Sequence, residues 1–114
     1  MTIQVSSRHV DSVTIVGLQG KLARGEGTTA LRDAIRGLLD QGHKKLLLHL
    51  GEIQYVDSAG IGELVATITT VRHHGGELKL LKPSAKVREL LEITKLTKVF
   101  DVNDDEPKAL KSFR

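Results

Sequence analysis

The residues best suited to chemistry lie in one stretch, Val56-Asp57-Ser58-Ala59-Gly60-Ile61-Gly62-Glu63-Leu64-Val65. Asp57 and Ser58 are both good helix N-caps, because a side-chain oxygen there accepts a hydrogen bond from a free backbone N–H group. A phosphate added to Ser58 would be tolerated, because the N-terminus of a helix carries partial positive charge. The stretch therefore predicts a serine at the start of a helix, either as a simple cap or as a site of modification.

Two glycines, Gly60 and Gly62, fall in the first turn of this expected helix. Each interior glycine costs about 1 kcal/mol of helix stability relative to alanine. Bare backbone beside an exposed hydroxyl would allow another protein to approach closely. The alternative interpretation is that the glycines only set a tight turn.

Catalytic and metal-binding patterns are missing from the sequence. Gly-x-Ser-x-Gly does not occur around Ser58, and Asp57 has no nearby acid except Glu63 with which to form an acid/base pair. His73 and His74 are adjacent and diverge on a helix, and the chain has no cysteine, so no metal site is predicted. A phosphate-binding Gly-x-x-x-x-Gly-Lys-Ser/Thr loop is also absent. From chemistry alone, we expect a domain without catalytic residues or cofactors that presents one serine.

Composition narrows the function further. A length of 114 residues predicts a single domain over residues 1–114, and aromatic residues make up only 3%, which disfavours stacking on single-stranded nucleic acid. The net charge of +3 comes from bases interleaved with acids, so direct binding of nucleic acid or of an anionic membrane is not expected. No signal peptide and no apolar run of about 20 residues is seen. We therefore expect a cytoplasmic protein that does not insert into membranes.

The first half of the chain reads as a hairpin, a loop and a helix. Strands are predicted over residues 3–5 and 13–18, joined by a polar turn at 9–12, and a glycine-punctuated loop follows over 20–27. Thr28 is expected to cap a helix that stops at Gly42. The apolar face of this helix is formed by Leu31, Ala34, Ile35, Leu38 and Leu39.

The second half alternates strands with helices. Residues 45–50 form an apolar run typical of a central strand buried on both faces, and residues 51–55 lead to the helix at Asp57, which Gly75-Gly76 ends. A strand at 77–81, a helix begun by Pro83 and Ser84, an edge strand at 99–102 and a terminal helix after Asn103 follow. The order β-β-α-β-α-β-α-β-α predicts an α/β fold, a mixed sheet with an N-terminal hairpin followed by alternating strands and about four helices.

Residues 48–62 resemble the signature of STAS domains, specifically the bacterial anti-sigma factor antagonists. That signature is an apolar strand, a short polar loop and then Asp-Ser-Ser/Ala-Gly-Leu/Ile-Gly. Gly20-Lys21-Leu22 is similar to the family's Gly-x-Leu-Asp loop, Leu31-Arg32 to a Leu-Arg pair in the next helix, and Gly75-Gly76-Glu77-Leu78 to a Gly-Gly-x-Leu strand entry. The resemblance covers nearly the whole chain.

The resemblance implies a STAS fold and a binding function. Similar proteins bind an anti-sigma factor that is also a serine kinase, and so free a sigma factor. The kinase phosphorylates the serine after the aspartate, which is Ser58 here, and a serine phosphatase reverses the modification. The implied partner surface consists of Asp57, Ser58, Gly60, Gly62, Glu63 and Thr67, together with Leu22, Ala23 and Arg24 from the preceding loop.

Two departures from the family pattern stand out. The loop aspartate of the family is Ala23 here, which predicts slow phosphorylation of Ser58 or a different kinase. His49 replaces an acid or amide in the central strand, where it would either make the charge near the site pH-dependent or be a buried neutral histidine.

Two alternatives remain open at this stage. The first is a STAS module that does not switch, acting as a scaffold in a signalling assembly or as the soluble subunit of a membrane transport complex. The second is a small nucleotide-binding or nucleotide-hydrolysing protein using the loop at residues 20–27. Phosphorylation of Ser58 by an anti-sigma factor kinase separates the first from the main hypothesis, and nucleotide binding tests the second.

Overall fold

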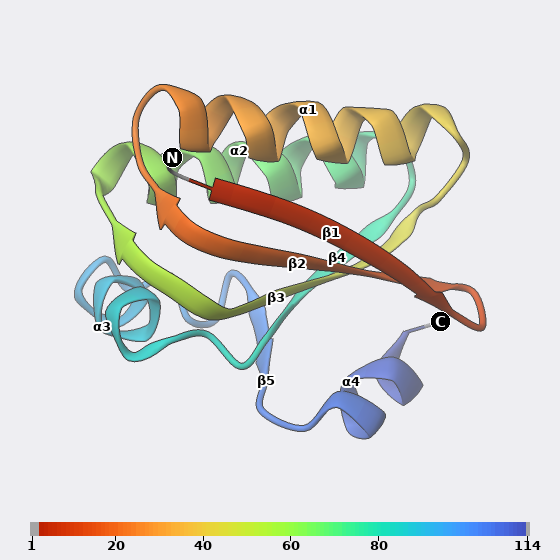
Figure 1. The fold of residues 1–114 in the computed structure, drawn as a ribbon. Coiled ribbons are helices and arrows are strands. Elements are labelled where there is room, and N and C mark those ends of the chain that lie inside the picture. The colour runs from red at the N-terminus through yellow and green to blue at the C-terminus, as the bar shows by residue number, and fades with distance from the viewer. Residues whose placement is uncertain (1–2, 114) are drawn as a thin grey trace.

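The computed structural model describes residues 3–113, so residues 1, 2 and 114 of the predicted domain lie outside the described part. Its five strands form one sheet in the order β1-β2-β3-β4-β5 (Figure 1). β1 is antiparallel to β2, and the other neighbours are parallel, which confirms the predicted mixed α/β fold. The elements are β1 (Ile3–Val10), β2 (Val13–Leu22), α1 (Glu26–Asp40), β3 (Lys45–Val56), α2 (Ser58–His73), β4 (Glu77–Leu81), α3 (Ala85–Ile93), β5 (Asp101–Asn103) and α4 (Glu106–Ser112).

The helices are distributed over both sides of the sheet. α1 and α2 lie side by side along one face, whereas α4 lies on the other side (Figure 1). Successive residues of β3 follow this division, since Leu46 and Leu48 belong to the large core cluster and Leu47 packs in a smaller cluster with Ala109 of α4. The first half of β3 is therefore buried on both faces, as the apolar run predicted.

Three strands run further than predicted. β1 extends to Val10 rather than ending at residue 5, β2 continues to Leu22 rather than 18, and β3 to Val56 rather than 50. The added halves of β2 and β3 pair with each other in parallel, with Gly20 opposite Ile53 and Leu22 opposite Val56. These hydrogen bonds join residues more than thirty positions apart, so local patterns did not reveal them. Most residues of β1 are exposed, so its sequence lacks the alternation of apolar and polar residues that would have predicted its full length.

Two further boundaries differ from the prediction. The edge strand β5 covers Asp101–Asn103 instead of residues 99–102, because only this segment pairs with β4. Thr28 does not cap α1, since the helix begins at Glu26 after the N-cap Gly25. The Thr28 hydroxyl instead accepts from the Gly25 N–H at 3.2 Å and lies 3.1 Å from its carbonyl oxygen.

The predicted helix stops are confirmed. Gly42 and Gly75 follow the last turns of α1 and α2 with φ of 91° and 77°, a region that side chains other than glycine rarely adopt. Ser84 caps α3 as predicted, and its hydroxyl accepts from the Val87 N–H at 3.4 Å.

Within residues 3–113, no helix combines the length and the apolar character needed to cross a membrane.

Candidate functional site

Asp57, between β3 and α2, joins two parts of the chain. Its Oδ1 accepts a hydrogen bond from the Gly60 N–H at 2.7 Å, which makes it the N-cap of α2. Its Oδ2 accepts from the Arg24 N–H at 3.1 Å, in the loop between β2 and α1. One carboxylate thereby fixes both the start of α2 and the preceding loop.

Ser58 is the first residue of α2 and its side chain is exposed. Of the two candidate caps, Asp57 performs that role and Ser58 does not, which corrects the expectation that either could. No residue within 3–113 forms a hydrogen bond with the Ser58 hydroxyl. The hydroxyl is therefore displayed to solvent at the positive end of a helix.

The pKa of Asp57 lies below the ordinary value for an aspartate. Partial burial of the carboxyl group raises this pKa, but backbone N–H donation from Gly60 and Arg24 and the positive charge of Arg24 outweigh that effect. The carboxylate consequently stays charged to a lower pH than an ordinary aspartate does, and the charged form accepts its two hydrogen bonds.

Replacing Asp57 with alanine is expected to lower the free energy of unfolding by about 1–2 kcal/mol, because the cap and the tether to the loop are both lost. The folded pKa of Asp57 is depressed, so its contribution is present above the unfolded pKa and is lost as the pH falls through the folded pKa. Urea unfolding of the wild type and Asp57→Ala from pH 7 down to acid measures both effects.

The matched control is Glu89→Ala, at an exposed position on α3, which should change the unfolding free energy by less than about 0.5 kcal/mol. A difference between wild type and Asp57→Ala that stays constant over the whole pH range would contradict the role given to the charged carboxylate.

Gly60 serves an internal contact rather than an external one. It is buried, and a Cβ built on it would lie 2.1 Å from the carbonyl oxygen of Leu22 and 3.0 Å from Cγ2 of Val56. Only glycine lets α2 approach the end of β2 this closely. The expectation that Gly60 leaves bare backbone for a partner is therefore wrong, whereas Gly62 is exposed and its Cβ would meet nothing within 4 Å.

The loop between β2 and α1 contains both buried and exposed residues. The Leu22 side chain is fully buried, so it anchors the loop instead of offering a side chain to a partner. Ala23 is half-buried and Arg24 is exposed. The structure thus brings Arg24, Asp57 and Ser58 to one end of the sheet as the resemblance implied, with Gly62 one helical turn beyond.

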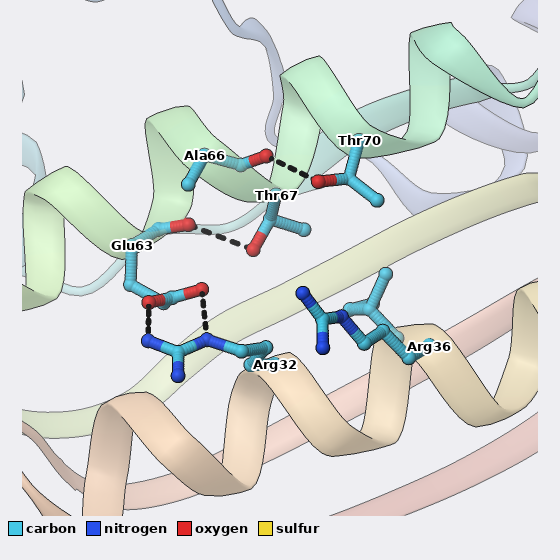
Figure 2. Close-up of a pocket in the computed structure, with 7 residues that line it drawn as sticks. Arg32, Arg36, Glu63, Ala66, Thr67 and Thr70 are labelled. Atoms are coloured by element: carbon cyan, nitrogen blue, oxygen red, sulfur yellow. Dashed lines mark hydrogen bonds and ion pairs between the residues drawn. The ribbon is translucent and has the colours of Figure 1, made fainter.

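Glu63 and Thr67 face the junction of α1 and α2 (Figure 2). The Glu63 side chain is 10% exposed and pairs with Arg32 of α1, with 2.8 Å between Oε1 and Nη2 and 3.4 Å between Oε2 and Nε. Thr67 is buried, and its hydroxyl donates to the Glu63 carbonyl at 2.7 Å. The Glu63–Arg32 pair joins α2 to α1, whereas the Thr67 hydroxyl bonds within α2. Sequence reasoning missed the Arg32 partner because the pair spans two helices.

His49 is not beside Ser58. It pairs in register with Gly17 and Leu81, and Leu81 belongs to the cluster on the α4 side of the sheet. There it lines a hollow of about 500 Å³ that also includes Gly17 and Glu52. Because α1 and α2 cover the opposite face, the expectation that His49 makes the charge at the Ser58 site pH-dependent has no structural basis.

Sequence reasoning also overlooked Tyr55. Its side chain is 50% exposed near the end of β3, three residues before Ser58, and it pairs in register with Lys21. Large, half-exposed aromatic side chains are frequent anchors in protein interfaces.

The described residues contain no group of three or more side chains placed to hold a metal ion.

Comparison with known proteins gives consistent results. The model of the STAS domain family matches residues 4–109. The anti-sigma-B factor antagonist of Bacillus subtilis is 36% identical over 103 residues, which cover 90% of this chain and 93% of that protein. A crystal structure of an anti-sigma factor antagonist from Mycobacterium paratuberculosis has a TM-score of 0.83 at 22% identity, covering 99% of this chain and 95% of that one. The Bacillus cell fate determinant SpoIIAA in its phosphorylated form has a TM-score of 0.71 at 19% identity, covering 96% and 97%.

Proposed function

Since the chain belongs to the STAS domain family, we propose that it is an anti-sigma factor antagonist, which binds an anti-sigma factor and thereby releases a sigma factor. The anti-sigma factor is a serine kinase that phosphorylates Ser58 and so switches binding off, and a serine phosphatase restores the bound state. A protein with this role acts in the cytoplasm, as one STAS domain without catalytic residues or a cofactor of its own.

The observation that carries the proposal is the exposed Ser58 hydroxyl at the first position of α2, beside a cap supplied by Asp57. Because Asp57 satisfies the backbone of the first turn, Ser58 can be modified without losing the cap. The helix N-terminus favours the added negative charge, so the phosphorylated domain stays folded. These are the properties expected of a kinase substrate.

The same modification would disrupt an interface centred on Ser58. A phosphate carries a charge of about −1.5 to −2 at neutral pH and must shed bound water when a partner covers it. Each 1.4 kcal/mol of that cost lowers the affinity about tenfold. One phosphate can therefore change binding by orders of magnitude without altering the fold.

Incubation with purified anti-sigma factor kinases from the same organism and ATP tests the proposal. We expect one phosphate per chain, which mass spectrometry places on Ser58, and none on Ser58→Ala. Because Ala23 replaces the loop aspartate of the family, the initial rate of wild type is compared with that of Ala23→Asp, which we expect to be faster.

Two other results would point elsewhere. Binding of an anti-sigma factor without any phosphorylation would favour a STAS module that does not switch. If neither binding nor phosphorylation is detected with any of these kinases, the proposed function is wrong, and the scaffold or transport-subunit role becomes the better explanation.

A further inference from the structure

We propose that the groove between α1 and α2 is a second contact for the anti-sigma factor, in which Arg36 receives a carboxylate side chain of that partner. This inference rests on the proposed function, because the occupant is the same partner that covers Ser58. It adds a contact on α1, a helix to which the resemblance assigned no part of the partner surface.

The groove is small, and three charged side chains lie in it beside apolar ones (Figure 2). Its volume is about 120 Å³, and its lining includes Arg32 and Arg36 from α1 and Glu63, Ala66 and Thr70 from α2. Pockets for small-molecule ligands usually measure about 300–1,000 Å³. The groove therefore fits the end of one protein side chain rather than a free ligand.

The groove carries one more positive charge than negative charge, because it is lined by two arginines and one glutamate. Arg32 and Glu63 form an ion pair, so their charges offset each other. Arg36 is exposed and forms no ion pair with any residue in the described range, and Figure 2 shows its guanidinium reaching from α1 toward α2. Both nearby acids of its own helix, Asp33 and Asp40, are exposed and are likewise not paired with it.

The other polar groups of the groove are already engaged. The hydroxyls of Thr67 and Thr70 donate to the carbonyls of Glu63 and Ala66, at 2.7 and 2.9 Å. Arg32 uses Nε and Nη2 on Glu63, whereas Arg36 forms no ion pair within residues 3–113, so its planar guanidinium can match a carboxylate through two parallel hydrogen bonds. An aspartate or glutamate side chain of the partner is therefore the chemically complementary occupant.

The groove is continuous with the surface around Ser58. Gly62 and Ala66 follow Ser58 at intervals of four residues on α2, both are exposed, and Ala66 lines the groove. At 1.5 Å per residue, Ala66 lies about 12 Å along the helix axis from Ser58. A standard interface buries about 800 Å² on each partner, so one protein seated on Ser58 is large enough to cover Ala66 and the groove that Ala66 and Arg36 line.

The test compares the affinity of the purified anti-sigma factor for wild type, Arg36→Glu, Arg36→Gln and the control Lys108→Glu. We expect Arg36→Glu to weaken binding by about tenfold or more, Arg36→Gln to weaken it less, and Lys108→Glu to change it by less than about twofold. Lys108 is a matched control because it is an exposed base on α4, on the other side of the sheet. Circular dichroism confirms that each variant is folded.

A charge-reversal scan of the partner identifies the acid that Arg36 contacts. Replacing that one Asp or Glu with arginine should restore most of the affinity lost in Arg36→Glu, whereas other reversals should not. If wild type binds and Arg36→Glu binds equally well, the groove contact is wrong and the proposed function stands. If wild type does not bind any anti-sigma factor, the proposed function is overturned and the groove contact with it.

Discussion

Replacing Ser58 with aspartate is expected to weaken binding of the anti-sigma factor by at least about tenfold, because an uncompensated charge covered by a partner costs about 2 kcal/mol or more. Phosphoserine, with roughly twice the charge, should have the larger effect. The stability of the fold should change little, because an acid at a helix N-terminus is favourable and Asp57 remains as the cap. Isothermal titration calorimetry and thermal unfolding measure the two quantities separately.

Ser58→Ala is the matched control for charge. It should bind like the unphosphorylated wild type and remain bound in the presence of kinase and ATP. Because Asp57 and not Ser58 caps α2, its free energy of unfolding should lie within about 0.5 kcal/mol of wild type. Equal affinities of wild type and Ser58→Asp for the partner would show that Ser58 lies outside the interface.

Gly60→Ala is expected to lower the free energy of unfolding by about 3 kcal/mol, because its Cβ would overlap the Leu22 carbonyl oxygen and force α2 away from β2. Neither neighbour can yield easily, since the Leu22 oxygen is backbone and its side chain is fully buried. Against a total stability of about 5–15 kcal/mol for a domain, this loss is large. Urea unfolding at neutral pH measures it.

Gly62→Ala supplies the comparison within the same helical turn. Its Cβ meets no atom within 4 Å, so the helix propensity of alanine should raise the unfolding free energy by up to about 1 kcal/mol. Opposite signs for the two substitutions are thus expected. Equal effects of Gly60→Ala and Gly62→Ala would contradict the close approach of α2 to the end of β2.

Patterns that operate over a few residues predicted their elements well. β4 begins and ends at the predicted residues, and the helix at Asp57 begins with one of its two predicted caps. Gly75 stops that helix in the expected conformation. Stops and apolar spacing act locally, so they can be read from a single sequence, whereas the cap prediction was right at Asp57 and Ser84 and wrong at Thr28.

Features that depend on distant contacts were missed. The second halves of β2 and β3 stabilise each other, and the reason for Gly60 is a carbonyl oxygen 38 positions earlier in the chain. The pair between Arg32 and Glu63 likewise spans two helices. His49 was misplaced for a related reason. Alternation along β3 shows which residues share a face with His49, but which helix covers that face is set by distant parts of the chain.

The candidate site has a consequence for what a partner can recognise. Arg24 and Asp57 meet through one hydrogen bond although 33 positions separate them, so a short peptide around the serine would lack the loop that contains Arg24. Under the proposed function, we therefore expect recognition to require the intact tertiary structure. A ligand that binds only the native state stabilises it, so the thermal stability of the domain should rise with partner concentration. Heating that unfolds the domain should likewise abolish partner binding.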